Sequence, residues 1–84
     1  SCIDIVAHKK NGKVVLFDIK TTSHFDRTYC SLQLSAYKRM FENCYGKQVE
    51  EMFVLSTKSR RKFRILEQEK EKVDRIFELN RKGF

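Results

Sequence analysis

The sequence predicts a small α/β domain built on a mixed β-sheet. Three observations lead to this fold class: four short apolar runs, two stretches in which apolar residues recur with helical spacing, and the absence of proline from all of them. The length of 84 residues suits one domain, expected to span 1–84, with a thin hydrophobic core. Seven Phe and three Tyr supply apolar surface to bury, which argues against intrinsic disorder.

The first two strands are predicted at 2–8 and 13–20, where they form an antiparallel hairpin. Asn11-Gly12 lies between them, and Asn-Gly is the strongest short-range signal for a hairpin turn. The polar residues of 21–26 predict a loop, at whose end Asp26 or Thr28 is a candidate N-cap for a helix.

A long helix is predicted over 27–45, because the apolar spacing becomes helical there. Its apolar residues fall on two sides: Tyr29, Leu32, Ala36 and Met40 on one, and Leu34, Tyr37, Phe41 and Cys44 on the other. Gly46 is a natural residue to end this helix, since glycine readily adopts the left-handed conformation of a C-terminal cap.

Two further strands are predicted at 48–57 and 63–66, paired antiparallel, followed by a second helix over 67–82. The second helix carries one apolar stripe, made of Val73, Ile76, Phe77 and Leu79. The order is therefore β-β-α-β-β-α, typical of a mixed central sheet flanked by helices. The strands before and after the first helix are expected to be parallel neighbours, joined by a right-handed crossover.

The chain is basic, with 18 Lys and Arg against 11 Asp and Glu and a formal net charge of +7, which favours polyanionic partners. A basic cluster separates the last two predicted strands and consists of Lys58, Arg60, Arg61, Lys62 and Arg64. It is either a solvated, charged hairpin turn or a contact for phosphate groups. No apolar run is long enough to span a membrane and no secretory signal peptide is visible, so a cytoplasmic protein is expected.

Three cysteines, Cys2, Cys30 and Cys44, are spread along the chain. An odd number without tight spacing is not a disulfide framework, and it suits a reducing compartment. All three are expected to be small buried hydrophobic residues. Because the chain has no Cys-x-x-Cys pair, a structural zinc site is not expected.

Three charged residues, Asp4, Asp18 and Lys20, stand within the apolar sequence of the first hairpin. Side chains alternate along a strand, so Asp18 and Lys20 point to the same face, and symmetric pairing about the turn brings Asp4 to their height. Two carboxylates beside a lysine suit a hard divalent ion such as Mg²⁺, which binds oxygen ligands together with water and phosphate. In the alternative, both carboxylates face solvent at strand ends and pair with lysines.

Three motifs, in order, resemble those of the PD-(D/E)xK nuclease superfamily, and within it the RecB-like exonuclease group. Ile3-Asp4 is similar to the G-x-x-D strand, Asp18-Ile19-Lys20-Thr21 to the (D/E)-x-K-T strand, and Gln33-Leu34-Ser35-Ala36-Tyr37 to the Q-x-x-x-Y helix. The resemblance covers 1–55 and implies a restriction-endonuclease-like core. It also implies a metal-dependent deoxyribonuclease, which hydrolyses phosphodiester bonds in phage or bacterial DNA recombination and repair.

By this resemblance, Asp4, Asp18 and the Ile19 carbonyl would bind Mg²⁺ or Mn²⁺, and Lys20 would be the catalytic lysine. Gln33 and Tyr37, one turn apart on the predicted helix, would line the site; the alternative is a Gln at the helix edge and a core Tyr. Candidate contacts for the DNA backbone are Thr21, Arg27, Arg60, Arg61 and Lys62. Some members of the group carry an iron–sulfur cluster on four cysteines, and with three cysteines no cluster is expected here.

The chain departs from the family pattern at its start. Family members carry a helix with a metal-facing residue and a first strand ahead of the G-x-x-D strand, whereas Asp4 lies close to Ser1. We therefore expect either a fragment of a longer nuclease or a minimal version that completes its site as a homodimer or higher oligomer. An exposed hairpin edge also favours pairing between chains. Two other functions stay open: a catalytically incomplete nucleic-acid-binding or assembly module, and a basic protein-interaction domain.

Overall fold

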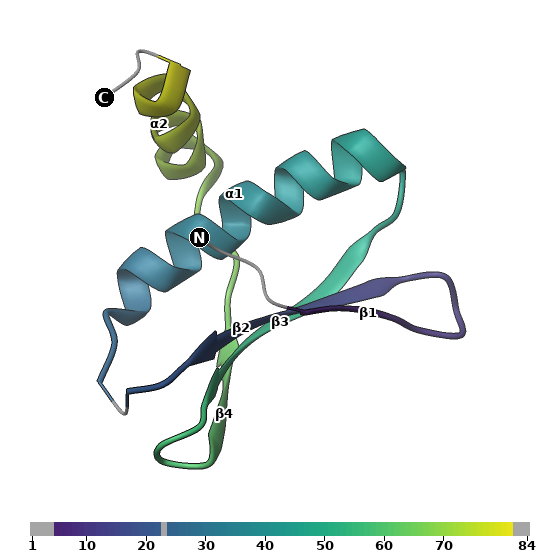
Figure 1. Cartoon of the computed structure of the whole chain (residues 1–84). Helices are drawn as coiled ribbons and strands as arrows, with labels where there is room; N and C mark the ends of the chain where they lie inside the picture. The colour runs from purple at the N-terminus through teal and green to yellow at the C-terminus, as the bar shows by residue number, and fades with distance from the viewer. Residues whose placement is uncertain (1–4, 23, 82–84) are drawn as a thin grey trace.

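The computed structural model describes residues 5–22 and 24–81, and these have the predicted order of elements. The elements are β1 (Ile5–His8), β2 (Val14–Lys20), α1 (Arg27–Tyr45), β3 (Val49–Ser56), β4 (Arg61–Ile65) and α2 (Lys70–Arg81). The prediction of a small α/β domain with a mixed sheet is confirmed (Figure 1). Among the described residues, two boundaries differ from the prediction by more than one residue: β4 begins at Arg61, within the basic cluster, and α2 begins at Lys70.

The β1–β2 hairpin turns at Asn11-Gly12, as its sequence predicts. Gly12 has a φ of 87°, a conformation that glycine adopts without steric cost, and its N–H donates to the carbonyl of Lys9 at 3.0 Å. The Asn11 side chain accepts a hydrogen bond from the N–H of Lys13 at 2.9 Å. The turn sets the register of the hairpin, in which Ile5 lies opposite Phe17.

The four strands form one sheet in the order β1-β2-β3-β4. The two outer pairs are antiparallel, whereas β2 and β3 are parallel and are connected by α1, so the three predicted pairings are confirmed. The parallel register places Asp18 beside Val54 and Lys20 beside Ser56. The carboxyl ends of β2 and β3 therefore meet at one edge of the sheet, the position at which open α/β sheets bind ligands. We call this the carboxyl edge and define it as residues 20–22, 24–27 and 56–61.

Helix α1 begins and ends with local capping interactions. Of the two candidate N-caps, Asp26 is the one used, and its side chain accepts a hydrogen bond from the N–H of Tyr29 at 3.0 Å. At the other end Gly46 has a φ of 68°, and its N–H donates to the carbonyl of Glu42 at 2.9 Å. The predicted C-terminal cap is thus confirmed.

The hydrophobic core lies between α1 and one face of the sheet. Its buried members are Val14, Leu16, Cys30, Leu34, Phe41, Val49, Met52, Val54 and Ile65. Only one of the two apolar sides predicted for α1 is buried, since Tyr29 and Met40 are 55% and 45% exposed. The predicted burial of Cys44 was wrong: this thiol is exposed in the last turn of the helix, beyond Phe41, where the core ends. Cys2 lies outside the described residues.

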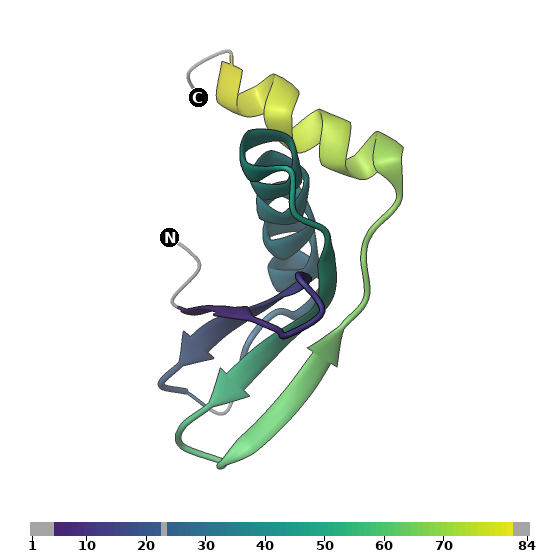
Figure 2. The same ribbon diagram turned by 90° about the vertical axis from the view of Figure 1, so that its right-hand side faces the viewer.

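Helix α2 packs across α1 on the side away from the sheet (Figures 1 and 2). Val73 is only 2% exposed in this contact. Arg39 of α1 forms an ion pair with Asp74, and its guanidinium lies 5.3 Å from the ring centroid of Phe77. The predicted apolar stripe of α2 is partly in water, because Leu79 is 43% exposed. In the described part of the chain, both helices therefore lie on one side of the sheet.

Candidate functional site

Asp18 is a buried carboxylate in the middle of the sheet. It follows Leu16 on the helix-facing side of β2 and lies beside Val54 of β3, with only 8% of its surface exposed. Lys20 is next on the same face, and its Nζ atom lies 3.2 Å from Oδ2 of Asp18. A charged carboxylate is costly to bury unless it is paired, so the ammonium group of Lys20 offsets that cost. The alternative in which Asp18 faces solvent is not what the structure shows.

The other two predicted metal ligands differ in how far the structure describes them. Asp4 lies outside the described residues. Ile19 follows the alternation of β2, so its side chain is on the opposite face from Asp18 and is 36% exposed. Across 5–22 and 24–81, no three His, Cys, Asp or Glu side chains are grouped as metal ligands. Within the described residues, the candidate metal ligands are the carboxylate of Asp18 and the backbone carbonyl of Ile19. Both are hard oxygen ligands of the kind that Mg²⁺ and Mn²⁺ prefer.

Hydrogen bonds at the carboxyl edge join the ends of β2 and β3. The carbonyl of Lys20 accepts from the N–H of Thr57 at 2.9 Å and from its hydroxyl at 3.3 Å. Ser56 is 2% exposed; its Oγ donates to the carbonyl of Thr22 at 3.0 Å and accepts from the N–H of Ser59 at 3.3 Å. These bonds fix the backbone on both sides of the site. Sequence reasoning missed Ser56, because only the parallel register reveals it as the partner of Lys20.

Cys30 is a residue of α1 whose thiol interacts electrostatically with Asp18 and Lys20. The side chain is 3% exposed, and burial raises the pKa of its thiol, an effect that the positive charge of Lys20 opposes and the negative charge of Asp18 reinforces. The first turns of α1 therefore carry a buried thiol within electrostatic range of the Asp18–Lys20 pair.

Gln33 and Tyr37 lie on the same flank of α1 as Cys30, because spacings of three and four residues share one helix face. Both are half-buried. Tyr37 packs against the hydrophobic core, and its ring centroid is 6.3 Å from that of Phe41. Gln33 donates from Nε2 to the hydroxyl of Tyr29, one turn earlier on the helix, at 2.8 Å. The hydrogen bond of Gln33 and the packing of Tyr37 thus lie within α1 and the core, as in the alternative of an edge Gln and a core Tyr.

The candidate DNA contacts are divided between the two faces of the sheet. Arg61 and Arg27 meet on the helix-facing side, where their guanidinium carbons lie 5.2 Å and 5.5 Å from the ring centroid of Phe63. Lys62 lies on the opposite face, with its Nζ 4.6 Å from the ring centroid of Phe53. The division follows from the alternation of side chains along β4. Sequence reasoning did not identify Phe63, since its two arginine neighbours come from different elements.

Arg60 and Thr21, the remaining two candidates, are exposed at the carboxyl edge. Arg60 lies in the β3–β4 turn with a φ of 56°, a left-handed conformation that costs a non-glycine residue about 1–2 kcal/mol. The basic cluster is therefore a charged hairpin turn that continues into β4.

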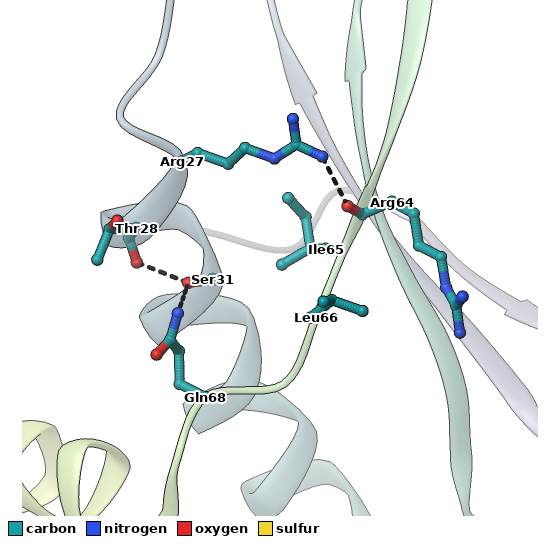
Figure 3. A pocket seen from close by; sticks show the side chains of 7 residues that line it. All are labelled: Arg27, Thr28, Ser31, Arg64, Ile65, Leu66 and Gln68. Carbon is teal, nitrogen blue, oxygen red and sulfur yellow. Dashed lines mark hydrogen bonds between the residues drawn. The ribbon is translucent and has the colours of Figure 1, made fainter.

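A groove lies between the start of α1 and the end of β4 (Figure 3). It has a volume of about 270 Å³ and is lined by Arg27, Thr28, Ser31, Arg64, Ile65, Leu66 and Gln68. The guanidinium of Arg27 spans one end and donates to the carbonyl of Arg64 at 3.1 Å. At the other end, Nε2 of Gln68 donates to Oγ of Ser31 at 2.6 Å.

Comparison of the chain with protein-family models, with curated proteins and with solved structures finds no match. The resemblance to nucleases therefore rests on the sequence motifs alone. Of the helices in 5–22 and 24–81, neither combines the length and the apolar character needed to cross a membrane.

Proposed function

We propose that the chain is the core of a metal-dependent deoxyribonuclease of the RecB-like type, acting on DNA in recombination or repair in the cytoplasm of a bacterial or phage-infected cell. The observation that carries the proposal is the buried Asp18 paired with Lys20 at 3.2 Å, near the carboxyl edge. A buried ion pair is weak evidence for stability, because desolvation offsets much of the attraction. A buried, paired carboxylate near a ligand-binding edge therefore favours a functional role.

The second carboxylate of the proposed site is Asp4, which directly precedes Ile5 in the sequence. Ile5 lies opposite Phe17, and Asp18 directly follows Phe17. The proposal would have this pairing continue by one residue, so that the two carboxylates share a face. In the proposal, Asp4, Asp18 and the Ile19 carbonyl hold Mg²⁺ or Mn²⁺.

A divalent ion bound there would lower the pKa of a water molecule and neutralise charge on the phosphate. Lys20 carries three N–H donors, with which it would orient the attacking water or hold a phosphate oxygen. Arg27 and Arg61 present planar guanidinium groups that suit phosphate, and they would hold the DNA backbone without reading its sequence. Thr21, Arg60 and Lys62 would extend this contact along the basic surface.

The test uses purified protein, end-labelled linear DNA and a comparison of Mg²⁺, Mn²⁺ and EDTA. We expect cleavage with either metal and none in EDTA. Lys20→Met should abolish cleavage while leaving calorimetric Mn²⁺ binding intact, whereas Asp18→Asn should abolish both. Lys47→Met, at an exposed position between α1 and β3, is the matched control and should behave as wild type. Metal-independent cleavage, no cleavage at all, or an active Lys20→Met protein would overturn the proposal.

A second candidate is a nucleic-acid-binding or assembly module that does not hydrolyse DNA. Its specific support is the meeting of Arg27 and Arg61 on Phe63, which does not involve the Asp18–Lys20 pair. In this case DNA binds without cleavage or metal, and the logarithm of the affinity falls linearly with the logarithm of the salt concentration. Binding without that salt dependence would instead favour a protein-interaction domain.

A further inference from the structure

We propose that the groove between α1 and β4 binds an unpaired nucleobase, so that nucleic acid is engaged as a single strand or a frayed end. The inference deepens the proposed function and rests on it for the class of partner. It concerns residues that play no part in the proposed metal site. Four features of the groove support the inference: its size, its apolar wall, its polar end and its positively charged mouth.

The size of the groove suits one small planar group. Sites that enclose drug-sized ligands have volumes of about 300–1,000 Å³. The groove, at about 270 Å³, is smaller than these, so it fits a single heterocyclic ring system better than a longer ligand.

The apolar wall of the groove comes from the extended connector that follows β4. Leu66 is 69% exposed, which leaves a large apolar side chain in water beside the groove. Ile65, at 4% exposure, forms the buried base of the same wall. Stacking a nucleobase against Leu66 would remove apolar surface from water on both partners.

The polar end of the groove presents the groups that recognise the edges of a base. Gln68 donates to the hydroxyl of Ser31 at 2.6 Å, and this hydroxyl in turn donates to the carbonyl of Thr28 at 2.8 Å (Figure 3). Unpaired bases are recognised by hydrogen bonds to their exposed edges, combined with stacking. An apolar wall and an amide–hydroxyl pair within one groove supply both contacts.

The mouth of the groove carries one positioned guanidinium group. Arg27 is held by the carbonyl of Arg64 at 3.1 Å and by the ring of Phe63, on which Arg61 also lies. The side chain of Arg64 points away from the groove and pairs with Glu51 at 3.6 Å (Figure 3). A guanidinium fixed in advance loses less conformational freedom when it binds phosphate. The negatively charged phosphate of a nucleotide whose base lies in the groove would therefore be placed at the positively charged Arg27. An apolar peptide side chain in the groove would bring no such negative charge.

The experiment compares two fluorescent single-stranded oligonucleotides of equal length by anisotropy, in EDTA so that no cleavage can occur. One is oligothymidine, and the other has the same phosphates but abasic sugars. We expect the thymidine strand to bind more tightly, but by no more than the about 5- to 150-fold that one base gains by stacking on an aromatic side chain, because the wall of this groove is aliphatic. Leu66→Ala should remove most of this difference and leave the affinity for the abasic strand unchanged. The matched control is Leu79→Ala, another exposed leucine, which should leave both affinities unchanged.

The proposal is overturned if the two strands bind equally, if neither binds, or if Leu66→Ala has no more effect than Leu79→Ala. A variant that weakens both strands equally would show a phosphate contact without a base site, which also contradicts it. These outcomes are separate from those of the nuclease proposal. A base preference in EDTA with no cleavage in Mg²⁺ or Mn²⁺ would keep the base site and reject hydrolysis.

Discussion

Replacing Asp18 with Asn keeps the shape of the buried side chain and removes its charge. Breaking a fully buried ion pair costs about 3–5 kcal/mol, because one charge is left without water or a partner. Here the partner, Lys20, has a side chain that is 32% exposed, so its ammonium group can regain water when Asp18 is neutral. The pair is therefore closer to a surface ion pair, worth about 0–1 kcal/mol. We expect the free energy of unfolding of Asp18→Asn to differ from wild type by less than about 1 kcal/mol.

Urea denaturation in EDTA measures this change in the free energy of unfolding. The variant Leu16→Ala serves as the reference for a large loss of stability. Leu16 precedes Asp18 on the same face of β2 and is 0% exposed, so its truncation should cost about 2–5 kcal/mol. Calorimetric titration with Mn²⁺ then tests function. Asp18→Asn should lose metal binding, whereas Glu71→Gln, which removes a carboxylate from an exposed position in α2, should retain it.

Two results would refute the reasoning. If Asp18→Asn destabilises the protein as much as Leu16→Ala, the carboxylate is a structural partner of Lys20. If Mn²⁺ still binds to Asp18→Asn with the affinity of wild type, Asp18 is not a metal ligand and the proposed site is wrong.

Three further predictions concern stability. Leu34→Ala removes a 2%-exposed side chain from the centre of α1 and should cost about 2–5 kcal/mol in urea denaturation, and a loss below 1 kcal/mol would contradict the placement of the core. A hydrogen bond from Lys70, and a second one from Arg39, lower the pKa of Asp74. The charged form of Asp74 therefore stabilises the folded protein above about pH 4, and this stabilisation is lost as the pH falls through the lowered pKa. Urea midpoints of wild type and Asp74→Asn should therefore converge as the pH falls below about 4, and a constant difference would be inconsistent with this pairing. Gly46→Ala places a Cβ at a φ of 68° and should cost about 1 kcal/mol, with Gly46→Asn costing less; equal losses would argue against the left-handed cap.

Local chemistry explains why much of the fold was predictable. The hairpin turn at Gly12 and the caps of α1 at Asp26 and Gly46 each depend on a few neighbouring residues. The turn and the cap at Gly46 were predicted, and Asp26 was one of the two N-cap candidates. The exposure of Cys44 was not predicted. Helical periodicity shows which residues share one side of a helix, but it does not show where the sheet that covers this side ends. The same limit applies to Met40, which belongs to an apolar side of α1 that nothing in the described part of the chain covers fully.

The candidate site was likewise predictable only in part. Because side chains alternate along any strand, the sequence was enough to predict that Asp18 and Lys20 share a face. The burial of Asp18 beside Val54 and the hydrogen bonds of Ser56 at the neighbouring edge could not be predicted, because the register of β2 and β3 is set across a crossover. The contact of arginines from α1 and β4 on Phe63 likewise depends on how a helix lies across a sheet. Alternation, turns and caps act over a few residues, whereas burial and the geometry of a site depend on which distant strands and helices pack together.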